Sequence, residues 1–197
     1  TGKRGVIGLP LGLNMYENLF FWEAFFRNLD FDIVVSDLSS RALYAKGQYS
    51  VPSDTACYPA KLMHGHIENL LDKGVTTIFY PCMSYNFDES KGDNHFNCPV
   101  VAYYPELLAS NVEKLKQVRY LYPYLDLAER KIFPKKIWQA LQEYYPDLTL
   151  REVKRASDCA YESYHCQREQ VKEEGRKALE FARQKGLKTI ILCGRPY

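Results

Sequence analysis

The chain has 197 residues, of which 46% are hydrophobic and 25% are charged, and its formal net charge is +2. This length suffices for one large or two small domains, and the near-neutral charge argues against nucleic acid as a partner. No apolar run approaches the roughly 20 residues that a membrane span needs, and the N-terminus lacks the apolar core of a signal peptide. We therefore expect a cytoplasmic protein that binds neither nucleic acid nor membranes.

The first half of the chain predicts alternating strands and helices. Apolar runs at residues 4–9, 32–36 and 76–80 have the length and composition of strands. Apolar residues recur at helical spacing over 18–29, and a second helix is predicted over 59–72 because a proline suits its first position and a glycine follows its end. Strands that are joined by helices pair in parallel.

Two further strands are predicted, at residues 99–104 (PVVAYY) and 118–121, and a polar loop without periodicity separates the first of them from the strand at 76–80. Together these elements predict an α/β fold. We expect an open, mainly parallel sheet of the Rossmann or flavodoxin type with flanking helices.

The pattern changes after residue 134. Residues 135–145 and the charged stretch from 152 to 184 predict helices, and LKTIILCGRPY at the C-terminus predicts a final strand and loop. We therefore divide the chain into an α/β domain at 1–134 and a helical extension with a strand at 135–197. The extension is expected to link to a following domain, so the chain is expected to be a fragment of a larger protein.

Cysteine is the residue type that points most directly to chemistry. In a cytosolic chain, clustered cysteines more often bind metal or do redox chemistry than form disulfides. Cys57 stands at the start of a predicted helix, where the helix dipole favours the thiolate, and Cys82 and Cys98 bracket the loop that follows a strand. We expect these three to converge on one rim as ligands, and the alternative is that they pack under loops as small apolar residues. Cys159 and Cys166, seven apart on the long predicted helix, are expected to pack without metal.

The histidines are weaker candidates. His64 and His66 are two positions apart, so on a helix they point about 200° apart and cannot both bind one metal. The expected outcome is one half-buried and one exposed imidazole. His95 lies three residues before a cysteine and is the better candidate for a hydrogen bond to a ligating group.

Several segments resemble the uncharacterised domain of large CoA-substrate-specific enzyme activase proteins, which are related to 2-hydroxyacyl-CoA dehydratases and their activators. The resemblance covers nearly the whole chain. It is carried by GLNMYENLFFWEAFF, SVPSDTACYPAKLMHGHIENLL, IFYPCMSY, FNCPVVAYYPELL and CGRPY, and its most specific piece is CYPAK followed by HGH.

The resemblance implies an anaerobic, ATP-driven, low-potential electron-transfer system. In related systems an activator ATPase with a 4Fe-4S cluster passes one electron to a dehydratase whose clusters are each held by three cysteines. Carried over to this chain, it implies a 4Fe-4S cluster on Cys57, Cys82 and Cys98. The implied partners are an activator ATPase module, dehydratase-like domains and acyl-CoA. The chain departs from its relatives at Cys193, where they carry a small residue.

Two alternatives remain open from the sequence. The domain could be a non-catalytic docking module whose many tyrosines form a contact surface, or the same cysteines could hold a structural zinc ion. The chain lacks the glycine-rich phosphate loops of an ATPase, so we expect neither ATP hydrolysis nor enzymatic turnover from this domain alone.

Overall fold

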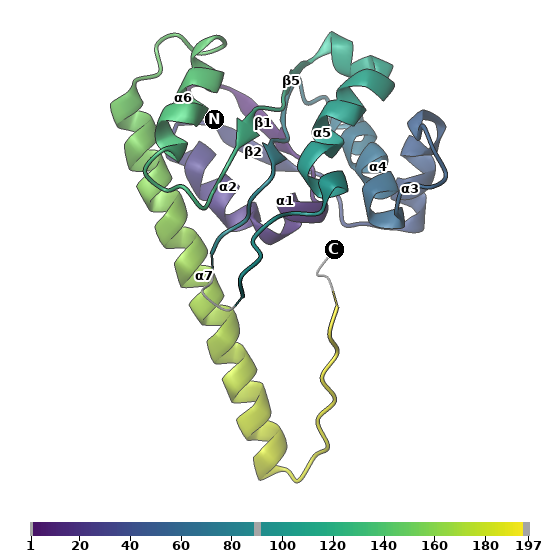
Figure 1. The fold of residues 1–197 in the computed structure, drawn as a ribbon, viewed down its shortest axis with the longest axis vertical. Coiled ribbons are helices and arrows are strands. Elements are labelled where there is room, and N and C mark those ends of the chain that lie inside the picture. Colours follow the sequence, from purple (N-terminus) through teal and green to yellow (C-terminus); the bar gives the residue numbers. More distant parts are fainter. Residues whose placement is uncertain (1, 89–91, 195–197) are drawn as a thin grey trace.

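The computed structural model describes residues 2–88 and 92–194, and its centre is a parallel sheet of four strands (Figure 1). The strand order is β2-β1-β3-β5, and β1 pairs with β2 in the register Val6 to Asp32 through Leu9 to Val35. This confirms the predicted α/β fold with a parallel sheet. The strands are β1 (Val6–Leu9), β2 (Asp32–Val35), β3 (Thr77–Phe79) and β5 (Arg119–Leu121).

A second pair of short parallel strands extends the sheet beyond the carboxyl ends of β3 and β5. It consists of β4 (Cys82–Met83) and β6 (Tyr124–Leu125). The ladder continues from one pair to the next, because the Tyr80 N–H donates to the carbonyl oxygen of Leu121 and the Cys82 N–H donates to that of Pro123, each at 2.9 Å. The arrangement places Cys82 past the carboxyl end of β3.

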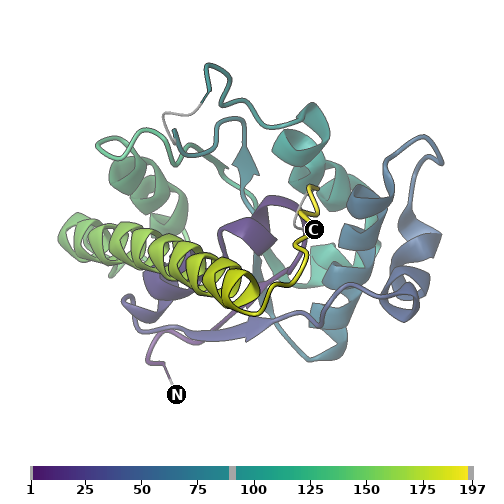
Figure 2. The same ribbon diagram turned by 90° about the horizontal axis from the view of Figure 1, so that it is seen from below.

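Helices cover both faces of the sheet. In the sheet, β2 lies on one side of β1 and β3 lies on the other, so the connection from β1 to β2 and the connection from β2 to β3 run in opposite directions across the sheet. Because both connections are right-handed, their helices lie on opposite faces. Figures 1 and 2 show α4 and α5 on one face, with α3 beside α4, and α2, α6 and α7 on the other. The helices are α1 (Leu13–Glu17), α2 (Leu19–Arg27), α3 (Arg41–Gly47), α4 (Tyr58–Asp72), α5 (Pro99–Asn111), α6 (Phe133–Gln142) and α7 (Leu150–Gln184).

Aromatic side chains from α2 form the centre of the core. The Trp22 ring lies 4.8 Å from the Phe79 ring of β3, and the Phe21 ring lies 5.0 Å from Tyr161 of α7 and 5.4 Å from Phe133 of α6. Each buried ring of this size contributes about 1.5–3 kcal/mol by leaving water. The helix α6 and the first half of α7 therefore share one core with the sheet.

The long helix predicted over 152–184 is confirmed as α7. A capping box starts it, because the Thr149 hydroxyl accepts from the Glu152 N–H while the Glu152 carboxylate accepts from the Thr149 N–H. Its buried side chains end at Tyr164, and the remaining turns project from the sheet (Figure 1). Within the described ranges, no helix has an apolar stretch that could cross a membrane.

The prediction of a strand at residues 99–104 was wrong, because these residues form the first turns of α5. Cys98 caps the helix, and Pro99 occupies a first-turn position where a missing N–H removes no hydrogen bond. A run of six apolar residues cannot be assigned by periodicity alone. This run packs against both α4 and β4, so it is apolar on more than one side.

The predicted final strand does not form within the described residues. Residues 187–194 are extended, but they pair with no strand, and Ile190 and Leu192 are 91% and 96% exposed. Strand propensity without a neighbouring strand leaves the backbone groups in water. The last three residues of that prediction, 195–197, lie outside the described residues.

Candidate functional site

Two of the predicted cysteines occupy the N-cap positions of neighbouring helices at the carboxyl edge of the sheet. Cys57 is the N-cap of α4 and Cys98 is the N-cap of α5, and a proline follows each in the first turn. Both side chains are exposed, and neither makes a capping hydrogen bond. Because α4 leads into the amino end of β3 and α5 leads into the amino end of β5, the N-termini of both helices lie at the opposite edge, where the parallel strands end.

Cys82 has a different environment. Its side chain is buried between β6 and α5, beside Tyr124, whose hydroxyl donates to the Glu106 carboxylate at 2.5 Å. Burial raises the pKa of the Cys82 thiol to about 11, so this group is a neutral thiol at physiological pH. In this conformation it is not prepared to act as a thiolate ligand.

The chemistry of the three thiols suits iron or zinc, but their arrangement does not form a ready ligand set. In the part of the chain that the structure describes, no group of three or more His, Cys, Asp and Glu side chains is placed to hold a metal ion. A site that uses Cys57, Cys82 and Cys98 together therefore requires at least one of these side chains to move. The shared site stays a prediction.

A cavity of about 1,190 Å³ opens at the same edge of the sheet. Leu11 and Asn14 line it from the segment after β1, Cys98 from the start of α5, and Tyr164 from α7. The strand order reverses at β1, and crevices outside the carboxyl ends of strands at such a switch point are the usual ligand sites of parallel sheets. The cavity thus places the Cys98 thiol in a ligand-sized space.

Asn14 adds a feature that the sequence analysis missed. Its side chain is 2% exposed, and both its amide oxygen and its amide nitrogen have no hydrogen-bond partner among the described residues. Asn18, one helical turn later, is buried and unpaired in the same way. Leaving a buried polar group unpaired costs about 1–3 kcal/mol. Two asparagines at helical spacing in the apolar segment GLNMYENLFFW were the signal for these positions.

His64 and His66 are both fully buried, so the prediction of one half-buried and one exposed imidazole was wrong. The helix α4 lies against the sheet and contacts both α3 and α5, which covers more than one of its faces. Burial lowers the pKa of each imidazole to about 4. Both are neutral at physiological pH.

Hydrogen bonds fix the His64 ring. The Ser50 hydroxyl donates to the Gly47 carbonyl at 3.0 Å, so it accepts from His64 Nδ1 at 2.7 Å. His64 Nε2 then accepts from the Tyr104 hydroxyl at 3.0 Å. Burial, with a smaller contribution from the nearby Cys57, raises the pKa of Tyr104 to about 12. A chain of neutral hydrogen-bonding groups therefore ends close to Cys57.

His66 is held between two serines. The Ser36 hydroxyl accepts from the Leu11 N–H at 2.7 Å and lies 2.8 Å from His66 Nδ1, and Ser39 Oγ lies 3.0 Å from His66 Nε2. Hydrogen bonds through this ring thus connect α4 to the segment after β2, and Ser36 connects that segment to the one after β1. Among the described residues, neither this imidazole nor that of His64 belongs to a group that could hold a metal ion.

His95 lines the same cavity as Cys98, and its Nε2 lies 3.4 Å from the Asp88 carboxylate. Its predicted hydrogen bond to a ligating group stays a prediction. Cys159 is half-buried and Cys166 is exposed on α7, and both are free thiols.

Comparison with known proteins supports the resemblance seen in the sequence. No curated protein and no solved structure matches the chain. The family model of the CoA enzyme activase uncharacterised domain matches residues 6–197, which is nearly the whole chain. The protein therefore belongs to the CoA enzyme activase uncharacterised domain family.

Proposed function

We propose that this domain is an iron–sulfur module of the CoA enzyme activase system. Cys57, Cys82 and Cys98 would hold the cluster. Cys57 and Cys98 are exposed, whereas Cys82 is buried and would be brought to them only by movement of the short β4–β6 pair. When bound, a 4Fe-4S cluster would supply one-electron transfer at low potential. The observation that carries the proposal is the pair of exposed cysteines that cap α4 and α5 at one edge of the sheet.

The helix N-termini support this role for Cys57 and Cys98. The first backbone N–H groups of a helix are unpaired within it, and the positive end of the helix dipole lies there, so negative charge is favoured. A cluster bound by thiolates carries negative charge. The cavity next to Cys98 gives space for such a group without displacing the core.

The short ladder of β4 supports the movement of Cys82. Among the described residues, the strand β4 consists of Cys82 and Met83 and forms its ladder with the two residues of β6, and the Met83 carbonyl also accepts from the Asn97 side chain. Short segments at the end of a sheet open at lower free energy than its centre. Leaving the core would restore the hydration of the thiol and let it ionise near neutral pH.

The expected partners follow from the family. We propose that an activator ATPase module and dehydratase-like domains exchange electrons with this domain, and that acyl-CoA is the compound on which the whole system acts. All six cysteines are free thiols, which fits a reducing cytoplasm.

Anaerobic reconstitution with iron and sulfide tests the proposal. We expect the native chain to bind iron, and Cys57→Ser, Cys82→Ser and Cys98→Ser each to lower the bound iron at least about twofold, because serine is rarely deprotonated. Cys159→Ser is the matched control and should retain full iron, since it changes a free thiol on α7 that does not line the cavity. Iron and acid-labile sulfide analysis gives the readout. Equal iron in the native chain and a triple Cys57, Cys82 and Cys98 variant would refute the assignment.

A docking module is the second candidate. The absence of a ready metal group among the described residues favours it, and so do the exposed Tyr16, Phe20 and Phe96 around the cavity. If the native chain binds neither iron nor zinc, this candidate replaces the first. Bound zinc without sulfide would instead indicate a structural zinc site.

A further inference from the structure

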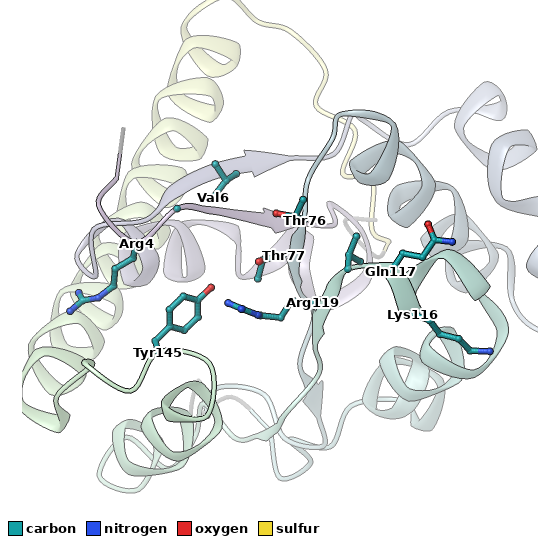
Figure 3. Close-up of a pocket in the computed structure, with 10 residues that line it drawn as sticks. Arg4, Val6, Thr76, Thr77, Lys116, Gln117, Arg119 and Tyr145 are labelled. Carbon is teal, nitrogen blue, oxygen red and sulfur yellow. The ribbon is translucent and has the colours of Figure 1, made fainter.

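A second pocket lies at the opposite edge of the sheet, where the strands begin. Its volume is about 470 Å³, within the range of small-molecule sites, and it is distinct from the cysteine-bearing edge. Arg119 begins β5, Thr77 begins β3 and Val6 begins β1, and all three line the pocket together with Tyr145 from the segment after α6. Figure 3 shows Arg119 and Tyr145 reaching toward each other across it.

Arg119 is held in place by aromatic rings. Its guanidinium lies 5.1 Å from the ring centroid of Tyr144 and 5.2 Å from that of Tyr145. Contacts of this kind orient an arginine and retain its full charge. Among the residues that the structure describes, no carboxylate pairs with Arg119 and no side-chain hydrogen bond uses its five N–H donors. The guanidinium is therefore exposed at the pocket, oriented by two rings, and its charge is unpaired among the described residues.

The other cations at the pocket do not share this property. Arg4 is neutralised by Glu152 at 2.9 Å and by Asp147 at 3.4 Å, and it also donates to the Leu29 carbonyl. Lys116 lies 3.4 Å from Glu113 and points away from the pocket in Figure 3. Arg119 is thus the cation that an incoming anion would meet.

The remaining polar side chains at the pocket are neutral groups that can donate, from Tyr145, Thr76, Thr77 and Gln117. The Tyr145 hydroxyl extends toward the Arg119 guanidinium, and the hydroxyls of Thr76 and Thr77 belong to the same lining (Figure 3). A guanidinium pairs with two oxygens of an anion at once, and hydroxyls can donate to a third. A carboxylate has two oxygens, whereas a phosphate group has at least three that accept. The donor set suits phosphate better.

We propose that this pocket binds the phosphate group of a small molecule, with Arg119 as the bidentate cation and Tyr145 and Thr77 as neutral donors. The volume leaves space for part of the molecule beyond its phosphate. The site does not depend on the proposed cluster, because it lies at the amino ends of the strands. It would allow a phosphorylated compound to bind while the other edge of the sheet is engaged.

Titration of the native chain with inorganic phosphate tests the proposal. The backbone amide signals of the pocket residues Thr76, Thr77 and Val118 in two-dimensional NMR spectra give the affinity in every variant, and the side-chain Nε–H signal of Arg119 is followed in the native chain. We expect saturable shifts of the Arg119 signal. Arg119→Gln should weaken binding by about tenfold or more, because a charge-assisted bidentate pair is lost. Arg119→Lys should weaken it as well, since a lysine keeps the charge without the planar fork. Tyr145→Phe should weaken it less, because the ring that orients Arg119 remains.

Arg41→Gln is the matched control, because it removes an exposed arginine at the start of α3, away from the pocket. It should leave phosphate binding unchanged, and circular dichroism should show the native fold in every variant. Acetate, tested at the same ionic strength, should bind more weakly than phosphate. Phosphate affinity that is equal in the native chain and Arg119→Gln, or no saturable shift in the native chain, would overturn the proposal.

Discussion

Replacing Gly65 by alanine should destabilise the domain by at least about 2 kcal/mol, even though alanine favours a helix by about 1 kcal/mol over glycine. Gly65 lies in the middle of α4, and a Cβ at this position would lie 2.1 Å from the carbonyl oxygen of Leu43 in α3. The obstacle is backbone, so no side-chain rotation relieves it. The helix α3 would have to move away from α4.

A second glycine, on α3, is equally close to the backbone of α4. A Cβ on Gly47, at the end of α3, would lie 2.2 Å from the backbone nitrogen of Gly65. Movement of α3 would also disturb Ser50, whose hydroxyl bonds both the Gly47 carbonyl and His64. The cost therefore includes hydrogen bonds as well as packing.

Urea denaturation followed by circular dichroism measures this effect, and Gly175→Ala is the matched control. Gly175 also lies in a helix, but it is exposed on α7 and a Cβ there would meet nothing within 4 Å. That substitution should cause no loss of stability and a gain of up to about 1 kcal/mol. If Gly65→Ala proves as stable as the native chain, then α3 and α4 do not approach this closely in solution.

Local signals were enough to predict most elements of the sheet and the helices around it. The segment Cys57, Tyr58, Pro59 was recognised as a helix start, and the structure begins α4 there. The same signal occurs at Cys98 and Pro99, where the apolar run PVVAYY was assigned as a strand instead. The N-cap residue and the proline were better guides than β-branched composition, because proline has a fixed φ and no N–H and therefore suits the first turn of a helix.

The candidate site was predictable only in part. The position of Cys57 and Cys98 at one edge of the sheet was predictable, because helix starts depend on nearby sequence and the edge at which they lie depends on chain direction. The burial of Cys82 depends on α5 and β6, and the burial of both α4 histidines depends on α3, α5 and the sheet. Such contacts join distant parts of the chain, and a single sequence does not show which of them form. In the same way, the sequence does not show that the buried amide of Asn14 has no hydrogen-bond partner among the described residues.

Lowering the pH from 7 to 5 should destabilise the domain by about 2 kcal/mol for each of His64 and His66. Burial lowers the pKa of both imidazoles to about 4, whereas the unfolded chain has the ordinary value near 6.5. Between these values the unfolded state binds more protons, so stability falls as the pH falls. Below about pH 4 the folded state is protonated too, and the loss from these groups stops. The charge of Asp37 opposes the effect of burial at His66.

Urea denaturation at a series of pH values, with NMR of the histidine rings in the native chain, tests this dependence. Few carboxylates change charge between pH 7 and 5, so the histidines dominate that interval. His64→Gln and His66→Gln should each remove about half of the slope, whereas His165→Gln, which changes an exposed imidazole on α7, should leave it as it is in the native chain. If either glutamine variant fails to fold, the ring signals of the native chain still decide the matter. Two imidazoles that remain neutral at pH 5 support the prediction, and protonation of both near pH 6.5 in the folded state would contradict it.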